Sequence, residues 1–306
     1  MCSSDLAQVS IGELLQALPG LEGRLAGHVM QCEQIAQVDS KDMSFAIWRD
    51  LARRLATLLN RADVSGVVIT HGTDTLEETA YFLHRVLPAK ALQNKAVVLT
   101  CAMRPASSQN PDGPQNLLDS VTVALDPQAR GVLVVCAGTV HGALDVQKTH
   151  TYLLDAFTSG DSGPIAYVEE AALRVLRAWP SPDSRQTDTS LRRCLGQAVW
   201  PRVEIVMNYA GASGQPVLSM LRDRTAMPEL RGLVVAGTGN GTVHLDLTQA
   251  LEKAQATGIR VVRTSRCANG RVLSSGRNDF SVATGLTAPK ARIELMLELM
   301  PTAAPA

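Results

Sequence analysis

The sequence predicts an α/β protein, with a doubly wound, mostly parallel sheet in a larger N-terminal domain and a smaller α/β domain at the C-terminal end. The first observation behind this prediction is that short β-branched runs alternate with stretches of helical periodicity. The second is that these runs are continuously apolar, as in parallel strands buried on both faces. The third is the length of 306 residues, which suits two domains of roughly 100–200 residues each.

Each continuous apolar run is an expected strand. In an open parallel sheet, ligands bind at the carboxyl ends of the strands. The polar residues directly after each run are therefore the candidate site residues. The expected strands are Gly66–Thr70, Ala96–Thr100, Gly131–Ala137, Val203–Asn208, Gly232–Gly237 and Ile259–Ser265.

Apolar residues at helical spacing, with local start and stop signals, indicate the helices. Asp42 or Ser44 precedes the first helix as a cap, and Thr75 with Glu78 fits a capping box at the second. Pro residues end or open helices, and Gly258 suits a C-cap. The expected helices are 48–58, Thr75–Leu87, Pro114–Leu125, Thr248–Thr257 and 293–300.

A polar, proline-containing stretch, Ala178–Thr189, has no periodicity and is typical of a linker. We therefore expect an N-terminal domain over residues 1–180, a linker over 181–195 and a C-terminal domain over 196–306. No internal repeat or low-complexity tract interrupts this organisation.

Composition excludes several classes of function. Lys+Arg and Asp+Glu balance at 29 each, so we expect no nucleic-acid or membrane partner. No apolar stretch approaches the roughly 20 residues that span a bilayer. The cysteines form no C-x-x-C pair and the histidines are unclustered, so we expect neither metal nor organic cofactor. Cysteine usage favours the cytoplasm, with the periplasm as the alternative.

The polar run Thr70–Thr75 (T-H-G-T-D-T) follows the first expected strand. Helix capping explains Thr75, but it does not require a Gly-Thr-Asp sequence before it. A hydroxyl and a carboxylate at the carboxyl end of a strand are placed to meet a substrate, so Thr73 and Asp74 are candidate catalytic residues. His71 is interpreted as structural, because no His-Asp-Ser set accompanies it.

Lys148 begins a second polar run, K-T-H-T, after the strand Gly131–Ala137. A lone lysine is most simply a solvated surface residue. A lysine in a dry site, however, loses its proton more easily and acts as a base towards a hydroxyl. In the functional interpretation, Thr73 and Lys148 form a hydroxyl–amine pair. Asp74 then either stabilises the positive charge of the lysine or binds the ammonium group of a substrate.

Two further segments have both a structural and a functional interpretation. Ser40, in D-S-K-D-M, is by default part of a helix cap and alternatively a donor to a substrate carboxylate. The run Gly237–Thr242 (G-T-G-N-G-T) is neither G-x-G-x-x-G nor a P-loop, so its phosphate-binding signal is weak. A tight turn is the simpler interpretation, and Asn240 is placed to reach a neighbouring active site.

Several segments occur together and in a fixed order: ELLQALPGL, QIAQVDSKDM, ITHGTDTLEETAYFL, VVLTCAMRPASSQNPDGPQNLLDSV, KTHTYLLDAF, RVEIVMNYAG, GLVVAGTGNGTV and PKARIELMLEL. Through them the sequence resembles the L-asparaginase/glutaminase family from about Ile11 to Met300. The resemblance implies a two-domain α/β enzyme that hydrolyses L-asparagine to L-aspartate and ammonia through a threonine acyl-enzyme. It also implies a homotetramer of close dimers, in which a partner's smaller domain completes each site.

The resemblance also implies residue roles. Lys148 is the base paired with Thr73, Asp74 binds the substrate amino group and Ser40 its α-carboxylate. Ala102 provides a backbone contact near the leaving amide.

Asn240 is the implied contribution of the partner's domain. A glutaminase-asparaginase that also takes L-glutamine is the alternative within the class. A non-catalytic amino-acid-binding protein, or a nucleotide-binding protein on the glycine run alone, are alternatives of another class.

Three departures from the family pattern affect the expected activity. The family's primary nucleophile lies in a T-G-G-T-I-A segment, and no G-G-T-I occurs in this sequence. We expect a truncated gene model, with a natural variant as the alternative, and a nearly inactive chain as written. Cys101 stands where glycine is usual, and Arg271–Asn278 lacks the substrate-contacting glutamate of many periplasmic members.

Overall fold

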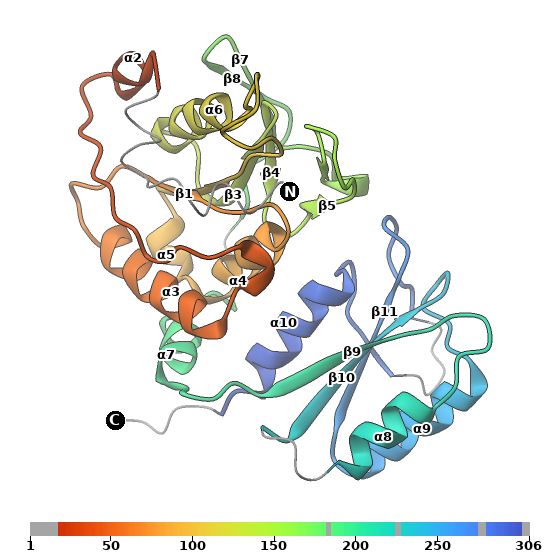
Figure 1. The fold of residues 1–306 in the computed structure, drawn as a ribbon. Helices are drawn as coiled ribbons and strands as arrows, with labels where there is room; N and C mark the ends of the chain where they lie inside the picture. The colour runs from red at the N-terminus through yellow and green to blue at the C-terminus, as the bar shows by residue number, and fades with distance from the viewer. Residues whose placement is uncertain (1–17, 182–184, 224–227, 275–279, 302–306) are drawn as a thin grey trace. The chain divides into compact units, whose positions relative to one another are not determined.

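The computed structural model describes residues 18–181, 185–223, 228–274 and 280–301. The chain divides into two compact units, Met1–Leu191 and Arg192–Ala306. Each unit has its own sheet with helices on both faces (Figure 1). The predicted α/β class is confirmed.

Within the described residues, the sheet of the first unit has six strands in the order β1-β2-β3-β4-β7-β8. The β1–β2 and β2–β3 pairs are parallel, whereas the β3–β4, β4–β7 and β7–β8 pairs are antiparallel. The antiparallel strands were not predicted, because β4 is only four residues of mixed polarity, and β7 and β8 are partly exposed and lack a continuous apolar run. The strands are β1 (Val67–Thr70), β2 (Ala96–Thr100), β3 (Gly131–Cys136), β4 (Thr139–Gly142), β7 (Ala166–Glu169) and β8 (Ala172–Val175).

Helices cover both faces of this sheet. Helix α6 packs on β1, β2 and β3, while α4 and α5 contact β3 from the other face, and α3 lies outside them (Figure 1). A buried cluster that includes Val98, Val123 and Leu133 fills the layer between α6 and the sheet. The helices are α2 (Leu21–Leu25), α3 (Phe45–Leu59), α4 (Leu76–Val86), α5 (Ala89–Leu92) and α6 (Gly113–Leu125).

Helix α3 illustrates how the sequence produces these elements. Ser44 caps it, because its side chain accepts a hydrogen bond from the N–H of Ile47 at 3.4 Å. Trp48, Leu51 and Leu55 recur at helical spacing and are buried, and each buried leucine stabilises the fold by about 1.5–3 kcal/mol. The Trp48 ring stacks on Phe82 of α4, with the ring centroids 4.8 Å apart. Helix α3 is therefore held against the helix that follows the candidate loop.

Short elements carry two of the candidate residues. The 3-10 turn η1 (Ser40–Asp42) contains Ser40 and begins after Asp39, whose side chain accepts from the N–H of Lys41. Strand β5 (Gln147–Lys148) contains Lys148 and pairs with β6 (Phe157–Thr158) in an antiparallel ribbon. A second 3-10 turn, η2 (Gly160–Ser162), follows the ribbon.

The second unit contains a four-stranded parallel sheet in the order β12-β11-β10-β9. Helix α10 packs on one face and α8 and α9 cover the other (Figure 1). The core under α8 and α9 includes Val217, Leu233 and Leu251. The elements are β9 (Arg202–Met207), α8 (Gln215–Arg222), β10 (Leu230–Gly237), α9 (Leu245–Ala256), β11 (Arg260–Ser265), β12 (Ser281–Val282) and α10 (Ala288–Leu299).

The predicted strands and helices are all present, with ends shifted by a few residues. Gly258 follows α9 with a φ of 89°, the left-handed conformation in which glycine ends helices at little cost. Helix α7 (Asp188–Gly196) was not predicted and occupies part of the segment expected as a linker. None of the described helices combines the length and apolar character needed to cross a membrane.

Candidate active site

Thr73 and Asp74 lie in the loop between the end of β1 at Thr70 and the start of α4 at Leu76. The carboxyl end of a parallel strand is the edge at which ligands bind in such sheets. Thr73 is buried, with 1% of its surface exposed, whereas the Asp74 side chain is 44% exposed. The loop therefore presents a carboxylate to solvent above a sheltered hydroxyl.

Lys148 meets both residues although it comes from β5. Its Nζ lies 2.8 Å from Thr73 Oγ1 and 2.7 Å from Asp74 Oδ1. The Thr73 hydroxyl also points at Asp74 Oδ1, at 3.4 Å. The three candidate catalytic residues thus form one hydrogen-bonded cluster. Its distances are those at which a neutral amine takes a proton from a hydroxyl.

His71 supports this loop through a chain of buried hydrogen bonds. Its Nδ1 lies 2.7 Å from the Gly72 carbonyl oxygen, and its Nε2 lies 2.9 Å from Thr79 Oγ1. Because a carbonyl only accepts, the proton sits on Nδ1 and the Thr79 hydroxyl donates to Nε2. Trp48 Nε1 in turn donates to Thr79 Oγ1 at 2.8 Å. Burial lowers the pKa of His71, which keeps the ring neutral and agrees with its predicted structural role.

Ser40 packs against the same loop. Its Oγ accepts from the N–H of Asp74 at 3.2 Å, and Ser40 is 2% exposed. A Cβ at Gly72 would lie 2.5 Å from Ser40 Oγ, so only glycine fits this close approach. The predicted capping box of Thr75 is wrong. Thr75 precedes α4, but its hydroxyl donates to the Ser40 carbonyl oxygen at 2.6 Å and makes no capping hydrogen bond.

Ala102 follows β2 and is buried. The Asn116 amide, from α6, donates to the Cys101 carbonyl at 2.9 Å and accepts from the N–H of Ala137 at 2.9 Å. The Asp112 carboxylate accepts from the N–H groups of Met103 and Arg104 at 2.9 and 2.8 Å.

Sequence reasoning did not identify Asn116 or Asp112. The signal that was available is a pair of short polar side chains at the start of a helix that follows a strand–loop junction.

Asn240 lies in the second unit, in the turn after β10. Its Nδ2 donates to the Leu273 carbonyl and its Oδ1 accepts from the Leu273 N–H, at 3.2 and 2.8 Å. The turn is closed by reciprocal backbone hydrogen bonds between Thr238 and Thr242. A Cβ at Gly237 would lie 2.4 Å from the Gly241 carbonyl carbon. The glycines of the run Gly237–Thr242 are therefore explained by the close backbone packing of this turn.

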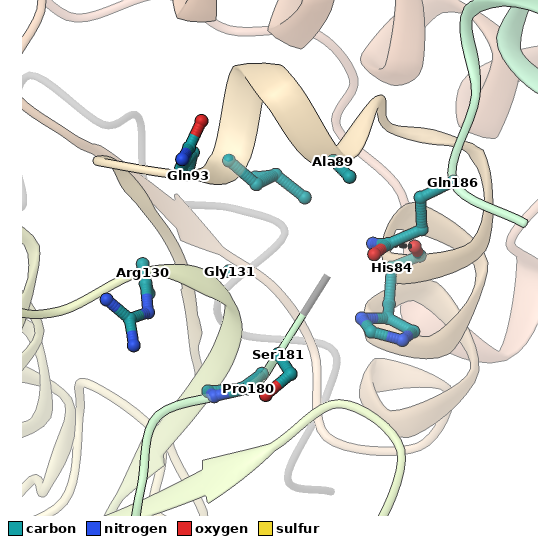
Figure 2. A pocket seen from close by; sticks show the side chains of 9 residues that line it. His84, Ala89, Gln93, Arg130, Gly131, Pro180, Ser181 and Gln186 are labelled. Carbon is teal, nitrogen blue, oxygen red and sulfur yellow. Dashed lines mark hydrogen bonds between the residues drawn. The ribbon is translucent and has the colours of Figure 1, made fainter. Parts of the chain in front are cut away.

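A separate hollow of about 150 Å³ lies in the first unit. It borders Gly131, the first residue of β3, and so lies towards the amino end of that strand. Figure 2 shows His84, Arg130 and Gln186 around it. The Gln186 amide donates to the His84 carbonyl oxygen at 2.5 Å. None of the candidate catalytic residues lines it.

Comparisons with known proteins cover nearly the whole chain. Residues 3–181 match the family model "Asparaginase, N-terminal", and residues 202–306 match "Glutaminase/Asparaginase C-terminal domain". A protein of Haemophilus influenzae named "Probable L-asparaginase periplasmic" is 37% identical over 97% of this chain and 82% of its own length. The "L-asparaginase 2" of Escherichia coli is 36% identical over 98% and 83%.

Other relatives extend this pattern. A "Glutaminase-asparaginase" of Pseudomonas fluorescens is 34% identical over 97% of this chain and 80% of its own length. The crystal structure of a "Probable Cytoplasmic L-asparaginase from Campylobacter jejuni" superposes with a TM-score of 0.85 at 32% identity, covering 97% of this chain and 91% of that one. The chain therefore belongs to the asparaginase family and is an amidohydrolase of the asparaginase type.

Proposed function

We propose that the chain hydrolyses the side-chain amide of L-asparagine to give L-aspartate and ammonia through a threonine acyl-enzyme. The observation that carries this proposal is the cluster of Lys148 Nζ with Thr73 Oγ1 and Asp74 Oδ1 at 2.8 and 2.7 Å. The names of relatives at 36–37% identity support the substrate.

The cluster supports a defined proton path. Lys148, once neutral, takes the proton of the Thr73 hydroxyl while the oxygen attacks the amide carbon. The lysine then passes this proton to the leaving nitrogen, which departs as ammonia. Water attacks the resulting ester in the second half of the reaction, and the threonine recovers its proton. The site needs no redox partner for this cycle.

The remaining candidates have binding roles in this proposal. Asp74 binds the substrate ammonium, because its carboxylate is the exposed member of the cluster. Ser40 binds the α-carboxylate, since the hydroxyl that accepts from Asp74 N–H still has a hydrogen to donate. Ala102 contributes a backbone contact to the amide.

Ammonia release tests the proposal. The sequence contains no T-G-G-T-I-A segment, the place of the family's primary nucleophile. We therefore propose that turnover by these 306 residues lies below the ~1–10³ s⁻¹ that is usual for enzymes. A slow, saturable release of ammonia from L-asparagine supports both statements. A turnover in the usual range refutes the low activity, and no release above the uncatalysed rate refutes the hydrolysis.

L-Glutamine is the second candidate substrate, because the Pseudomonas fluorescens relative is named a glutaminase-asparaginase. Parallel assays with both amides at equal concentration decide between them. A non-catalytic amino-acid-binding protein is the alternative of another class. Calorimetry that detects L-aspartate binding without hydrolysis of either amide favours that alternative.

The assembly is part of the proposal. We propose a homotetramer of close dimers in which Asn240 of a partner's smaller domain (residues 196–306) completes the site of the larger domain (residues 1–180). Light scattering gives the number of chains. A chain that is monomeric in solution and binds L-aspartate as tightly as an assembled enzyme would contradict the proposed tetramer. The proposed compartment is the cytoplasm, and cell fractionation tests it against the periplasm.

A further inference from the structure

Glu77 joins the main chain of Lys148 to helix α4. The carboxylate oxygen Oε2 of Glu77 accepts a hydrogen bond from the backbone N–H of Lys148 at 2.5 Å. Glu77 lies in the first turn of α4 and is 8% exposed. A carboxylate at this helix end also interacts favourably with the helix dipole, but the dipole alone does not require a contact with a residue 71 positions away.

The strand that carries Lys148 is short. Strand β5 has two residues, Gln147 and Lys148, and it pairs with the two-residue strand β6. Two-stranded ribbons are marginally stable even when they are longer. A charged acceptor strengthens a hydrogen bond to roughly twice that of a neutral pair. The hydrogen bond to Glu77 thus fixes a short element of the chain to helix α4.

The same helix also positions the other half of the cluster. Helix α4 begins at Leu76, immediately after Thr73, Asp74 and Thr75. Glu77 therefore ties the lysine backbone to the helix whose start holds the threonine and the aspartate. Since errors of about 1 Å in such a constellation cost on the order of 10²-fold in rate, a fixed backbone at Lys148 matters for the 2.8 Å contact between its amine and Thr73.

We propose that Glu77 is a positioning residue of this enzyme, which sets the Lys148 amine at hydrogen-bonding distance from Thr73 by holding the lysine's backbone N–H. This inference rests on the proposed roles of Thr73 and Lys148. In this proposal Glu77 acts through the backbone of Lys148.

Three substitutions at one position test the inference. Glu77→Gln removes the charge but keeps an oxygen that accepts the N–H. Glu77→Asp keeps the charge at the helix end but shortens the side chain by one methylene. Glu77→Ala removes both. Glu78→Ala is the matched control, because Glu78 is the neighbouring carboxylate in the same helical turn.

We expect kcat for ammonia release to fall about 10- to 100-fold in Glu77→Ala and Glu77→Asp, with KM within about threefold of the parent. Glu77→Gln should lose less of kcat than these two variants, because its neutral oxygen still accepts the N–H in a weaker bond, and Glu78→Ala should match the parent. A merely structural role predicts a different pattern, in which the loss follows the fraction of folded protein and Glu77→Asp is the mildest change. Equal kcat per folded molecule in Glu77→Ala and Glu78→Ala overturns the inference.

A second readout does not depend on turnover. Competitive acetylation with acetic anhydride measures the rate at which the Lys148 amine reacts, and this rate is lower when hydrogen bonds hold the amine in place. Mass spectrometry of the peptide that contains Lys148 reads out the modification. Amide hydrogen exchange measures protection of the Lys148 N–H. Both rates should rise several-fold in Glu77→Ala and Glu77→Asp, less in Glu77→Gln and not in Glu78→Ala. Unchanged rates in the first two variants overturn the inference, even if the parent protein releases no ammonia and the proposed function fails.

Discussion

The amine nitrogen of Lys148 lies 2.8 Å from the hydroxyl oxygen of Thr73, although 75 positions separate the two residues in the sequence. Both side chains are sheltered, since Thr73 is 1% exposed and the Lys148 side chain 17% exposed. Exclusion of water strengthens the interaction between an amine and a hydroxyl and favours proton transfer between them. The pair is the centre of the candidate site.

Replacing the hydroxyl tests this pair. Thr73→Val keeps the shape of the side chain and removes the oxygen, so we expect ammonia release to fall about 10²–10⁴-fold relative to the unsubstituted chain. Steady-state rates with L-asparagine measure the loss. Thr57→Val is the control, because Thr57 lies on the exposed side of α3 and its hydroxyl donates to the Arg53 carbonyl oxygen of the same helix. A rate for Thr73→Val within threefold of the control contradicts the role of this hydroxyl.

Thr79→Val should destabilise the protein. The substitution leaves Trp48 Nε1 and His71 Nε2 without the oxygen that each now contacts, at 2.8 and 2.9 Å. Each buried polar group that loses its partner costs about 1–3 kcal/mol. Urea denaturation should therefore give a free energy of unfolding about 2–6 kcal/mol below that of the parent. Thr57→Val should change the free energy of unfolding by less than about 0.5 kcal/mol. An equally small change in Thr79→Val would contradict the prediction.

His71 should make stability depend on pH in a defined window. Burial holds its pKa below the usual value of 6.5, so the unfolded chain binds a proton at a pH where the folded chain does not. Unfolding then takes up a proton, and the free energy of unfolding decreases as the pH falls through 6.5 towards the folded pKa. The contribution of the neutral His71 ring to the free energy of unfolding is fully present above pH 6.5.

Comparison with His71→Gln isolates this contribution. Urea denaturation at pH values of about 7 and 5 should show a smaller loss of stability in the variant than in the parent. The NMR signal of the His71 ring should titrate only at a pH below its usual pKa of 6.5. Equal losses in the two proteins, or a His71 ring that titrates near its usual pKa, would rule out the buried neutral imidazole.

The thiols should differ sharply in reactivity. Cys101 and Cys136 are buried, with their sulfurs 3.7 Å apart. The hydrogen bond to Cys136, together with burial, raises the pKa of Cys101 well above its usual value. Since the thiolate is the nucleophile, iodoacetamide at about pH 8 should alkylate exposed Cys267 and leave Cys101 and Cys136 unmodified until guanidinium is added. Alkylation of Cys101 at the rate of Cys267 in the native protein would contradict the buried pair.

Local patterns in the sequence were sufficient to predict the main strands of both sheets and the main helices that cover them. The continuous apolar run Ala96–Thr100 becomes a strand in which every residue is buried, because a strand covered on both faces carries mostly apolar side chains. The short strands β7 and β8 escaped prediction for the converse reason, since their partly exposed residues carry no such pattern. The Thr75 hydroxyl was misassigned because a capping box and a bond to a distant carbonyl use the same residue type.

The sequence by itself determined the fold class, the family and the polar loop that contains Thr73 and Asp74, because periodicity and motif order are properties of neighbouring residues. The sequence also suggested that Lys148 pairs with Thr73, but only the tertiary structure showed the contact of its amine with the loop. The tertiary structure alone revealed that Glu77 holds the backbone N–H of this lysine. Hydrogen bonds require placement within a few tenths of an ångström. That placement depends on how strands and helices far apart in the chain pack together, which no local pattern records.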